Sequence, residues 1–255
     1  MSLNKARIRQ RFTRAASTYD RQAVIQLRVA DRLLSLLGQN PGPHPKILLE
    51  IGCCTGLLTS RLAQQFKGLT TLYVNDLVPQ FKARVAEKID RDVNLVFLTG
   101  DIESLELPSG LDLIISSSTF HWLEDLPALF QRLYEHMAPG GTFAFSMYGR
   151  DNLRELRAIT GTGLQYYGLD DVEHLVRKYF TLAASDEERI TIHFKSPVDM
   201  LHHLRETGVN SLDETLWSRS RLNDFIQRYQ DRFGDQNQVR LTYHPIYCIA
   251  RKEAI

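Results

Sequence analysis

The chain of 255 residues carries 31 lysines and arginines against 30 aspartates and glutamates, with 43% hydrophobic and 24% charged residues. This composition is that of a globular protein of one large domain, and the net charge of +1 excludes a polyelectrolyte that binds nucleic acid through its overall charge. No apolar run approaches the roughly 20 residues of a membrane-spanning helix, and neither the first residues nor the three cysteines indicate secretion, so we expect a cytoplasmic protein without membrane contact.

Residues 4–37 are expected to be mostly helical, because an amphipathic pattern of apolar residues runs from Ala23 to Leu37. A basic cluster precedes this pattern, formed by Lys5, Arg7, Arg9, Arg11 and Arg14. The cluster is compatible with a nucleic-acid-binding arm, a solvated helix face or a surface that steers an acidic partner. The prolines of residues 38–45 then end the helix.

A strand, a glycine-containing turn and a helix are expected next, with the strand at residues 46–49 and the helix from Leu57. The turn between them reads Glu50-x-Gly52-x-Cys54-x-Gly56. Its glycines would let the backbone approach a ligand where a Cβ would collide. The spacing differs from the Gly-x-Gly-x-x-Gly of dinucleotide sites, and an acid before the first glycine suits a cationic ligand better than a pyrophosphate.

Acidic residues end two of the following strands. The expected strands cover residues 71–76, 95–102, 111–118 and 142–148, and the expected helices cover 81–89 and 126–137. Asp76 lies about twenty residues past the glycine turn, where such folds place the carboxylate that binds ribose hydroxyls, although it could also cap the strand. Asp101 is suited to accept a hydrogen bond from an adenine amino group, with Ile102 beside it.

The second half of the chain departs from a simple alternation of strands and helices. Expected helices cover residues 152–160, 171–180, 197–206 and 221–233, and expected strands cover 189–194 and 238–251. We expect the last strand to pair antiparallel with 189–194, and Pro245 to mark an edge position or a bulge.

Six blocks distributed along the chain carry a family resemblance. They are Phe12-x-x-Ala15-Ala16-x-x-Tyr19-Asp20, Leu49-Glu50-Ile51-Gly52-Cys53-x-Thr55-Gly56, Phe120-His121-Trp122-Leu123, Asn152-Leu153-Arg154-Glu155-Leu156, Leu204-Arg205-x-Thr207-Gly208-Val209-Asn210 and Leu241-Thr242-Tyr243-His244-Pro245-x-Tyr247. Together they resemble the malonyl-carrier-protein O-methyltransferases of biotin synthesis, within the class I methyltransferases that use S-adenosylmethionine (SAM). The glycine turn resembles motif I of that superfamily, with Cys54 where a third glycine is usual.

The resemblance implies an α/β, Rossmann-like fold with a mostly parallel seven-stranded sheet, an antiparallel last strand, helices on both faces and a helical lid insertion. It implies one methyltransferase domain over residues 1–255. Its parts are an N-terminal helical segment over the site (1–45), a SAM-binding core (46–148), helical additions with one strand near 189–194 (149–235) and the final strand (238–251).

The reaction that the resemblance implies is methyl transfer from SAM to the free carboxylate of malonyl-acyl carrier protein, an early step of biotin synthesis. The products are a methyl ester and S-adenosylhomocysteine, no metal takes part, and malonyl-CoA is a second candidate substrate. Neither nucleic acid nor a membrane is an expected partner. Two alternatives stay open: another small-molecule SAM methyltransferase, acting on a free dicarboxylic acid or a quinone precursor, and a non-catalytic binding protein of this fold.

A carboxylate with an ordinary pKa of about 4 is already an ionised nucleophile at neutral pH, so this reaction needs no general base. The site must instead align the carboxylate with the methyl group and exclude water. The expected cofactor-binding residues are Glu50, Gly52, Cys53, Gly56, Asp76, Leu77, Asp101, Ile102 and Ser117. The candidates for positioning the substrate are Tyr19, His121, Trp122 and Arg150.

Overall fold

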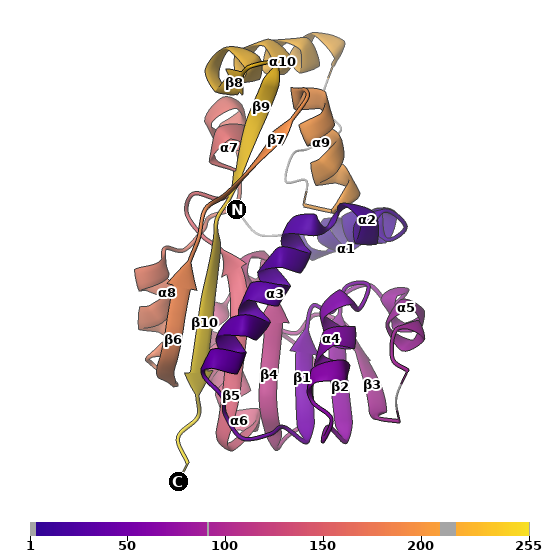
Figure 1. Cartoon of the computed structure of the whole chain (residues 1–255), viewed down its shortest axis with the longest axis vertical. Coiled ribbons are helices and arrows are strands. Elements are labelled where there is room, and N and C mark those ends of the chain that lie inside the picture. Colours follow the sequence, from indigo (N-terminus) through magenta and orange to yellow (C-terminus); the bar gives the residue numbers. More distant parts are fainter. Residues whose placement is uncertain (1–3, 91, 210–217, 255) are drawn as a thin grey trace.

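The computed structural model describes residues 4–90, 92–209 and 218–254, and its centre is a seven-stranded sheet (Figure 1). In chain order its strands are β1 (Ile47–Ile51), β2 (Thr71–Asp76), β3 (Asn94–Thr99), β4 (Leu111–Ser117), β5 (Met137–Tyr148), β6 (Thr181–Glu187) and β10 (Pro245–Arg251). The order across the sheet is β3-β2-β1-β4-β5-β10-β6. Strands β1 to β5 are parallel, and β10 runs antiparallel between β5 and β6. The predicted mostly parallel sheet of seven strands is confirmed.

Alternating side chains of the sheet face two separate apolar cores. In β1, Leu48 belongs to one core, whereas Leu49 and Ile51 belong to the other. The first core is completed by α3 (Val24–Gln39), α4 (Leu57–Gln65) and α5 (Phe81–Glu87), and the second by α6 (Leu126–His136) and α8 (Leu169–Val176). Helices therefore cover both faces, as the sequence predicts, and the near-continuous apolar runs of the central strands follow from this double burial.

A second, three-stranded sheet lies above the carboxyl ends of the parallel strands (Figure 1). Its strands are β7 (Ile190–Phe194), β8 (Gly234–Asp235) and β9 (Gln238–Tyr243), and its helices are α7 (Arg154–Thr160), α9 (Pro197–Glu206) and α10 (Arg219–Phe233). Strand β9 pairs antiparallel with β7, so that part of the predicted pairing is confirmed.

Three predictions for this half of the chain are wrong. The segment 238–251 is two strands, because the chain passes from one sheet to the other at His244. The neighbour of β10 in the main sheet is β6, a strand that we did not predict, rather than 189–194. Pro245 is neither at a sheet edge nor in a bulge. It begins β10 between two paired strands, and at a first strand position its missing N–H is tolerated.

One boundary of the central sheet also differs from expectation. The strand expected at residues 142–148 begins earlier, because β5 starts at Met137 and includes residues 139–141. The register between β4 and β5 shifts between Leu111 and Leu113, and this irregularity accommodates the glycines without ending the strand.

Two short helices from the N-terminal segment, α1 (Lys5–Ala15) and α2 (Tyr19–Gln22), lie between the two sheets at the carboxyl ends of the parallel strands (Figure 1). Across the described ranges, no helix is long and apolar enough to span a bilayer. Asn210, the last residue of one family-like block, lies outside the described residues.

Candidate active site at the carboxyl ends of the strands

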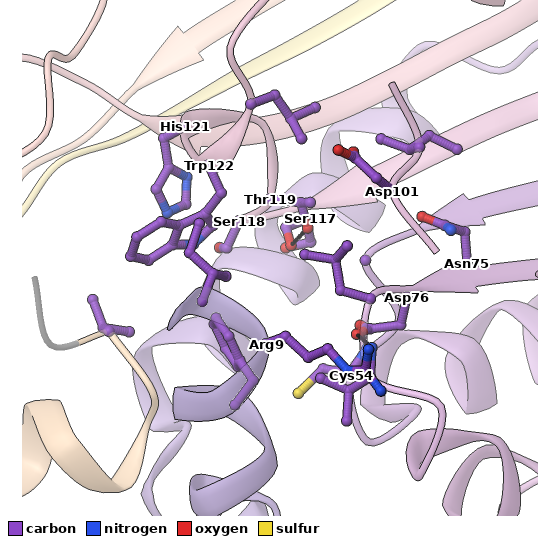
Figure 2. A pocket seen from close by; sticks show the side chains of 18 of the residues that line it. Arg9, Cys54, Asn75, Asp76, Asp101, Ser117, Ser118, Thr119, His121 and Trp122 are labelled. Atoms are coloured by element: carbon purple, nitrogen blue, oxygen red, sulfur yellow. Dashed lines mark hydrogen bonds between the residues drawn. The ribbon is translucent and has the colours of Figure 1, made fainter. Parts of the chain in front are cut away.

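A pocket with an empty volume of about 770 Å³, open to solvent, lies where the parallel strands end and α1 and α2 cross them. The predicted site residues that line it are Tyr19, Gly52, Asp76, Leu77, Asp101, Ile102, Ser117, His121 and Trp122. They come from five separate segments of the chain, and Figure 2 shows the polar members facing a common space.

Four predicted site residues do not line the pocket. Glu50 and Cys53 are buried, and Gly56 precedes the first turn of α4. Arg150, expected to position the substrate, lies on the surface: its guanidinium pairs with Asp171 at 2.6 Å, and its side chain is 67% exposed. The structure therefore corrects the expectation that Arg150 reaches the pocket.

The glycine turn brings the backbone close to the pocket floor at Gly52. This residue has φ +74°, and a Cβ added to it would lie 2.0 Å from Oγ1 of Thr119. Only glycine fits without displacing Thr119. Cys54 has φ +48°, in the left-handed region that favours glycine, which explains why glycine is usual at this position of motif I.

Two carboxyl groups give the pocket region its electrostatic character: Asp76, which is half-buried in the lining, and Glu50, which is buried outside it. Asp76 accepts backbone hydrogen bonds from Cys54 and Val78, both at 2.9 Å, yet burial raises its pKa to about 6. Each of its oxygens keeps a lone pair for a further donor, such as a ribose hydroxyl. Burial also raises the pKa of Glu50 to about 8, and its Oε2 has no hydrogen-bond partner in the parts of the chain described.

These features fit SAM. The close approach at Gly52 makes room for a ligand on the backbone, Asp76 suits a vicinal diol, and the unpartnered carboxyl of Glu50 would be stabilised in its ionised form by a nearby cation. Asp101 lines the same pocket and pairs with Lys5 of α1 at 3.1 Å, so its predicted contact with adenine would be made beside this ion pair.

The opposite wall is aromatic. The ring of His121 packs 4.9 Å from Tyr148, and Phe12 of α1 meets the Trp122 ring edge-on at 6.2 Å. Burial lowers the pKa of His121 to about 3, so its imidazole is neutral, and its Nδ1 has no hydrogen-bond partner among the described residues. Burial also raises the pKa of Tyr19 well above its ordinary value, so the phenol stays protonated.

Sequence reasoning missed Arg9 as a pocket residue, although it noted the basic cluster to which Arg9 belongs. Ile8, Arg9 and Phe12 line the pocket from α1. In the described lining, Arg9 is the one side chain that carries a positive charge at neutral pH. Helical spacing groups these residues on one side, but only the docking of α1 shows that this side faces the pocket.

Asp20 was also missed as a contact residue. It accepts a hydrogen bond from the Thr55 hydroxyl in the glycine turn and pairs with Lys88, just past α5, at 2.6 Å. The adjacent Tyr19 is thereby fixed over the pocket. Across the described residues, no group of three or more His, Cys, Asp or Glu side chains is placed to hold a metal ion.

Comparison with known proteins places this geometry in context. A family model described as "Methyltransferase domain" matches residues 49–145. The chain is 39% identical to the malonyl-acyl-carrier-protein O-methyltransferase of Prosthecochloris aestuarii, over 98% of this chain and 94% of that protein. It is 35% identical to the protein of the same name in Bacteroides thetaiotaomicron, over 99% and 100% of the two chains.

Solved structures with the same fold are more distant in sequence. The N-methyltransferase NodS from Bradyrhizobium japonicum, solved with S-adenosylhomocysteine, matches with a TM-score of 0.52 at 19% identity, over 88% of this chain and 85% of its own. The YcgJ protein from Bacillus subtilis matches with a TM-score of 0.60 at 13% identity, over 87% and 97%. These likenesses support the fold alone.

Proposed function

The chain belongs to the malonyl-acyl-carrier-protein O-methyltransferase family, and we propose that it methylates the free carboxylate of a malonyl thioester carried by an acyl carrier protein. The membership rests on 39% identity to a relative over nearly the full length of both chains. The observation from the site that supports the proposal best is a pocket that brings two half-buried carboxylates, Asp76 and Asp101, together with Arg9, the one arginine of its described lining. A cationic cofactor and an anionic substrate group can therefore be bound in one space.

The protein is a SAM-dependent methyltransferase, and bound SAM supplies a methyl group on a positively charged sulfur. We propose that Asp76 holds the ribose, that Asp101 and Ile102 contact the adenine, and that Gly52 lets the backbone lie against the cofactor. Leu77 and Ser117 line the same space. Glu50 would balance the positive charge from behind the glycine turn, because its buried carboxyl otherwise has an unpartnered oxygen.

No side chain of this pocket has to remove a proton. The malonyl carboxylate is ionised at neutral pH, whereas His121 is neutral and the pKa values of Tyr19 and Tyr148 are raised by burial. These groups can therefore act as neutral hydrogen-bond partners. The aromatic wall with Trp122 and Phe12 would exclude water, which strengthens the carboxylate as a nucleophile.

Arg9 is the residue that we propose for binding the malonyl carboxylate, because guanidinium groups make strong charge-assisted bonds to carboxylates. Changing Arg9 to Gln should raise KM for malonyl-acyl carrier protein about tenfold, the cost of roughly one charged hydrogen bond. Arg9→Lys should retain part of the affinity. Calorimetry should find the SAM Kd of both variants unchanged, and a weaker SAM affinity would instead place Arg9 on the cofactor.

The proposal also covers a second substrate, the metabolic setting and the location of the protein. Malonyl-CoA is a second candidate substrate, because it presents the same carboxylate on a thioester. Biotin synthesis is the expected setting, and a cytoplasmic location is favoured by three free cysteines, two of them adjacent in a turn. The alternative of a non-catalytic protein of this fold depends on Cys54, whose side chain enters the pocket at a position where glycine is usual.

The direct test is the intact mass of malonyl-acyl carrier protein after incubation with the enzyme and SAM. The proposal expects a gain of one methyl group, which mild ester hydrolysis removes. Free malonate and malonyl-CoA are tested in parallel, so that a gain on free malonate alone would favour the free-acid alternative. No methylation of any acid, with SAM binding intact, would refute the substrate assignment and leave the fold assignment in place.

A further inference from the structure

A second cavity, with an empty volume of about 720 Å³ and open to solvent, lies between α1 and the end of α9. Three arginines and one carboxylate line it: Arg11, Arg14, Arg205 and Glu206. The methyl-transfer chemistry proposed above uses none of these residues. A concave site with three guanidinium groups is suited to a compact anion such as a phosphate.

This cavity adjoins the methyl-transfer pocket, and the two share a wall. Phe12 lines the pocket and Gly208 lines the cavity. A Cβ added to Gly208 would lie 2.9 Å from the Phe12 ring, so the two residues are in close contact. The next residue, Val209, lines the pocket again. The arginine-lined cavity therefore lies directly beside the pocket, with Phe12 and Gly208 between them.

One hydrogen bond joins the two elements, and a second orients an arginine within α9. The Thr18 hydroxyl, just past α1, donates to the main-chain oxygen of Glu206 at 3.0 Å. Arg205 is oriented by a 2.9 Å contact between its guanidinium and Nδ1 of His202. The arginines of α1 are thus kept opposite Arg205 across the cavity.

We propose that this arginine cavity binds the phosphodiester of the phosphopantetheine arm that carries the malonyl group. The inference rests on the proposed function, because it is the carrier protein that presents its acyl group on such an arm. The substrate then has two anionic groups, the malonyl carboxylate at its reacting end and the phosphodiester near its attachment. The structure offers arginines at two adjoining places, Arg9 in the pocket and the arginine cavity beside it. A cavity, rather than a flat patch, favours a group borne on a narrow arm over the acidic surface of a protein.

The test compares two small competitors of the malonyl-acyl carrier protein reaction. Malonyl-phosphopantetheine carries the phosphate and malonyl-pantetheine lacks it, and the inhibition constant Ki of each can be measured whether or not it is methylated. The wild type should bind the phosphorylated compound about tenfold or more tightly than the other. Arg14→Gln and Arg205→Gln should each remove most of that difference, with the Ki of malonyl-pantetheine and the SAM Kd unchanged.

Arg232→Gln is the matched control, because Arg232 is an exposed arginine of α10 that lines neither cavity. Equal Ki values for the two compounds in the wild type would overturn the proposal. So would variants that weaken only the carrier-protein substrate, because the arginines would then contact the protein surface. If the wild type fails to methylate malonyl-acyl carrier protein at all, the proposed function itself is wrong. That result differs from equal Ki values and from variants that weaken only the carrier-protein substrate.

Discussion

A turn can require glycine because a neighbouring atom leaves no room for a Cβ or because the backbone has a positive φ. Gly52 and Gly110 show the two cases. Gly52 has a positive φ of +74°, and its Cα hydrogen points at Thr119, so that an added Cβ would meet Oγ1 at 2.0 Å. Gly110 has almost the same φ, +73°, but open space around it. The first glycine is therefore required by close approach, whereas the second is required by backbone conformation alone.

Gly52→Ala should weaken SAM binding more than tenfold, because Thr119 or the turn must move into the space that the cofactor needs. Gly110→Ala should leave the SAM Kd unchanged while lowering stability by about 1 kcal/mol, the usual cost of a left-handed residue that is not glycine. Calorimetry with SAM and thermal unfolding of both variants measure the two effects. Equal SAM affinity in the two variants would show that Gly52 is required for its backbone conformation and not for the close approach of Thr119.

Asp76 gives SAM binding a pH dependence whose sign follows from burial. Burial raises the pKa of this carboxyl to about 6, and the cofactor's hydroxyl groups would bond the ionised form better than the protonated one. The SAM Kd should therefore rise as pH falls through about 6, by up to about tenfold per pH unit. Asp76→Asn should weaken binding at pH 7.5 by about 1–3 kcal/mol and remove this step.

Titrations of the wild type and Asp76→Asn at several pH values isolate this contribution, because all other titrating groups are common to both proteins. Glu50, with a pKa raised to about 8, is one such group. If the two proteins show the same change in Kd below pH 6, the carboxylate that binds the ribose lies elsewhere.

At the scale of single elements, the N-terminal helices act as a cover that is fastened at defined points. Asp20 connects α2 to the glycine turn through Thr55 and to Lys88 beyond α5. Lys5 of α1 pairs with Asp101 on the other side of the pocket. The contact of Asp20 with Thr55 reaches the glycine turn, which lines the cofactor site through Gly52 and Cys54, so it couples the position of Tyr19 to SAM binding.

Asp20→Ala should release α2 from the glycine turn and speed the dissociation of S-adenosylhomocysteine, with about a tenfold weaker Kd. Asp31→Ala is the matched control: Asp31 of α3 pairs with Arg61 of α4 at 2.7 Å, is 54% exposed and lies outside the pocket lining. A surface pair of this kind contributes about 0–1 kcal/mol, so its loss should leave cofactor dissociation unchanged. Stopped-flow release rates compare the two, and equal rates would mean that Asp20 only stabilises the fold.

The sequence predicts those helices, strands and turns whose own residues carry a recognisable pattern, such as an apolar run or a glycine turn. Apolar runs predict β1, β2 and β4, and the glycine turn and Asp76 predict the cofactor side of the pocket. Strand β6 was missed because Thr181–Glu187 contains two alanines and three polar or acidic residues near its end, a poor strand pattern. It becomes a strand by pairing with β10. Arg9 and the arginine cavity were not predicted as sites, because the docking of α1 decides which cavity each of its sides faces.

At the scale of the molecule, the two sheets share one core and are joined directly by two short chain segments, β6 to β7 and β9 to β10. Strand β9 leads into β10 through His244, which is 2% exposed and joins three segments. Its Nδ1 accepts the backbone N–H of Asp151 at 3.0 Å, and its Nε2 lies 2.9 Å from the Glu187 carboxylate. The larger core cluster includes Leu48 of the main sheet together with Leu241 and Tyr243 of the small one.

We therefore predict that the chain unfolds as a single cooperative domain. Trp217→Phe leaves Trp122, in the pocket wall, as the only tryptophan, so its fluorescence reports on the pocket while circular dichroism reports on all helices and strands. The two urea transitions should coincide, and SAM should shift both by the same amount, because it binds only the folded state.

His244→Ala in the same background tests whether the junction couples the sheets. It leaves the Asp151 N–H and the Glu187 carboxylate without their buried partner, which should cost about 1–3 kcal/mol of unfolding free energy. If the junction at His244 is what couples the two sheets, the variant's two transitions should separate, with the pocket signal surviving to the higher urea concentration. If both transitions shift together, the shared core around Leu241 and Tyr243 is sufficient for coupling. If the fluorescence and circular dichroism transitions are already separate in Trp217→Phe with His244 intact, the prediction of a single domain is wrong. The small sheet is then an independently folding unit.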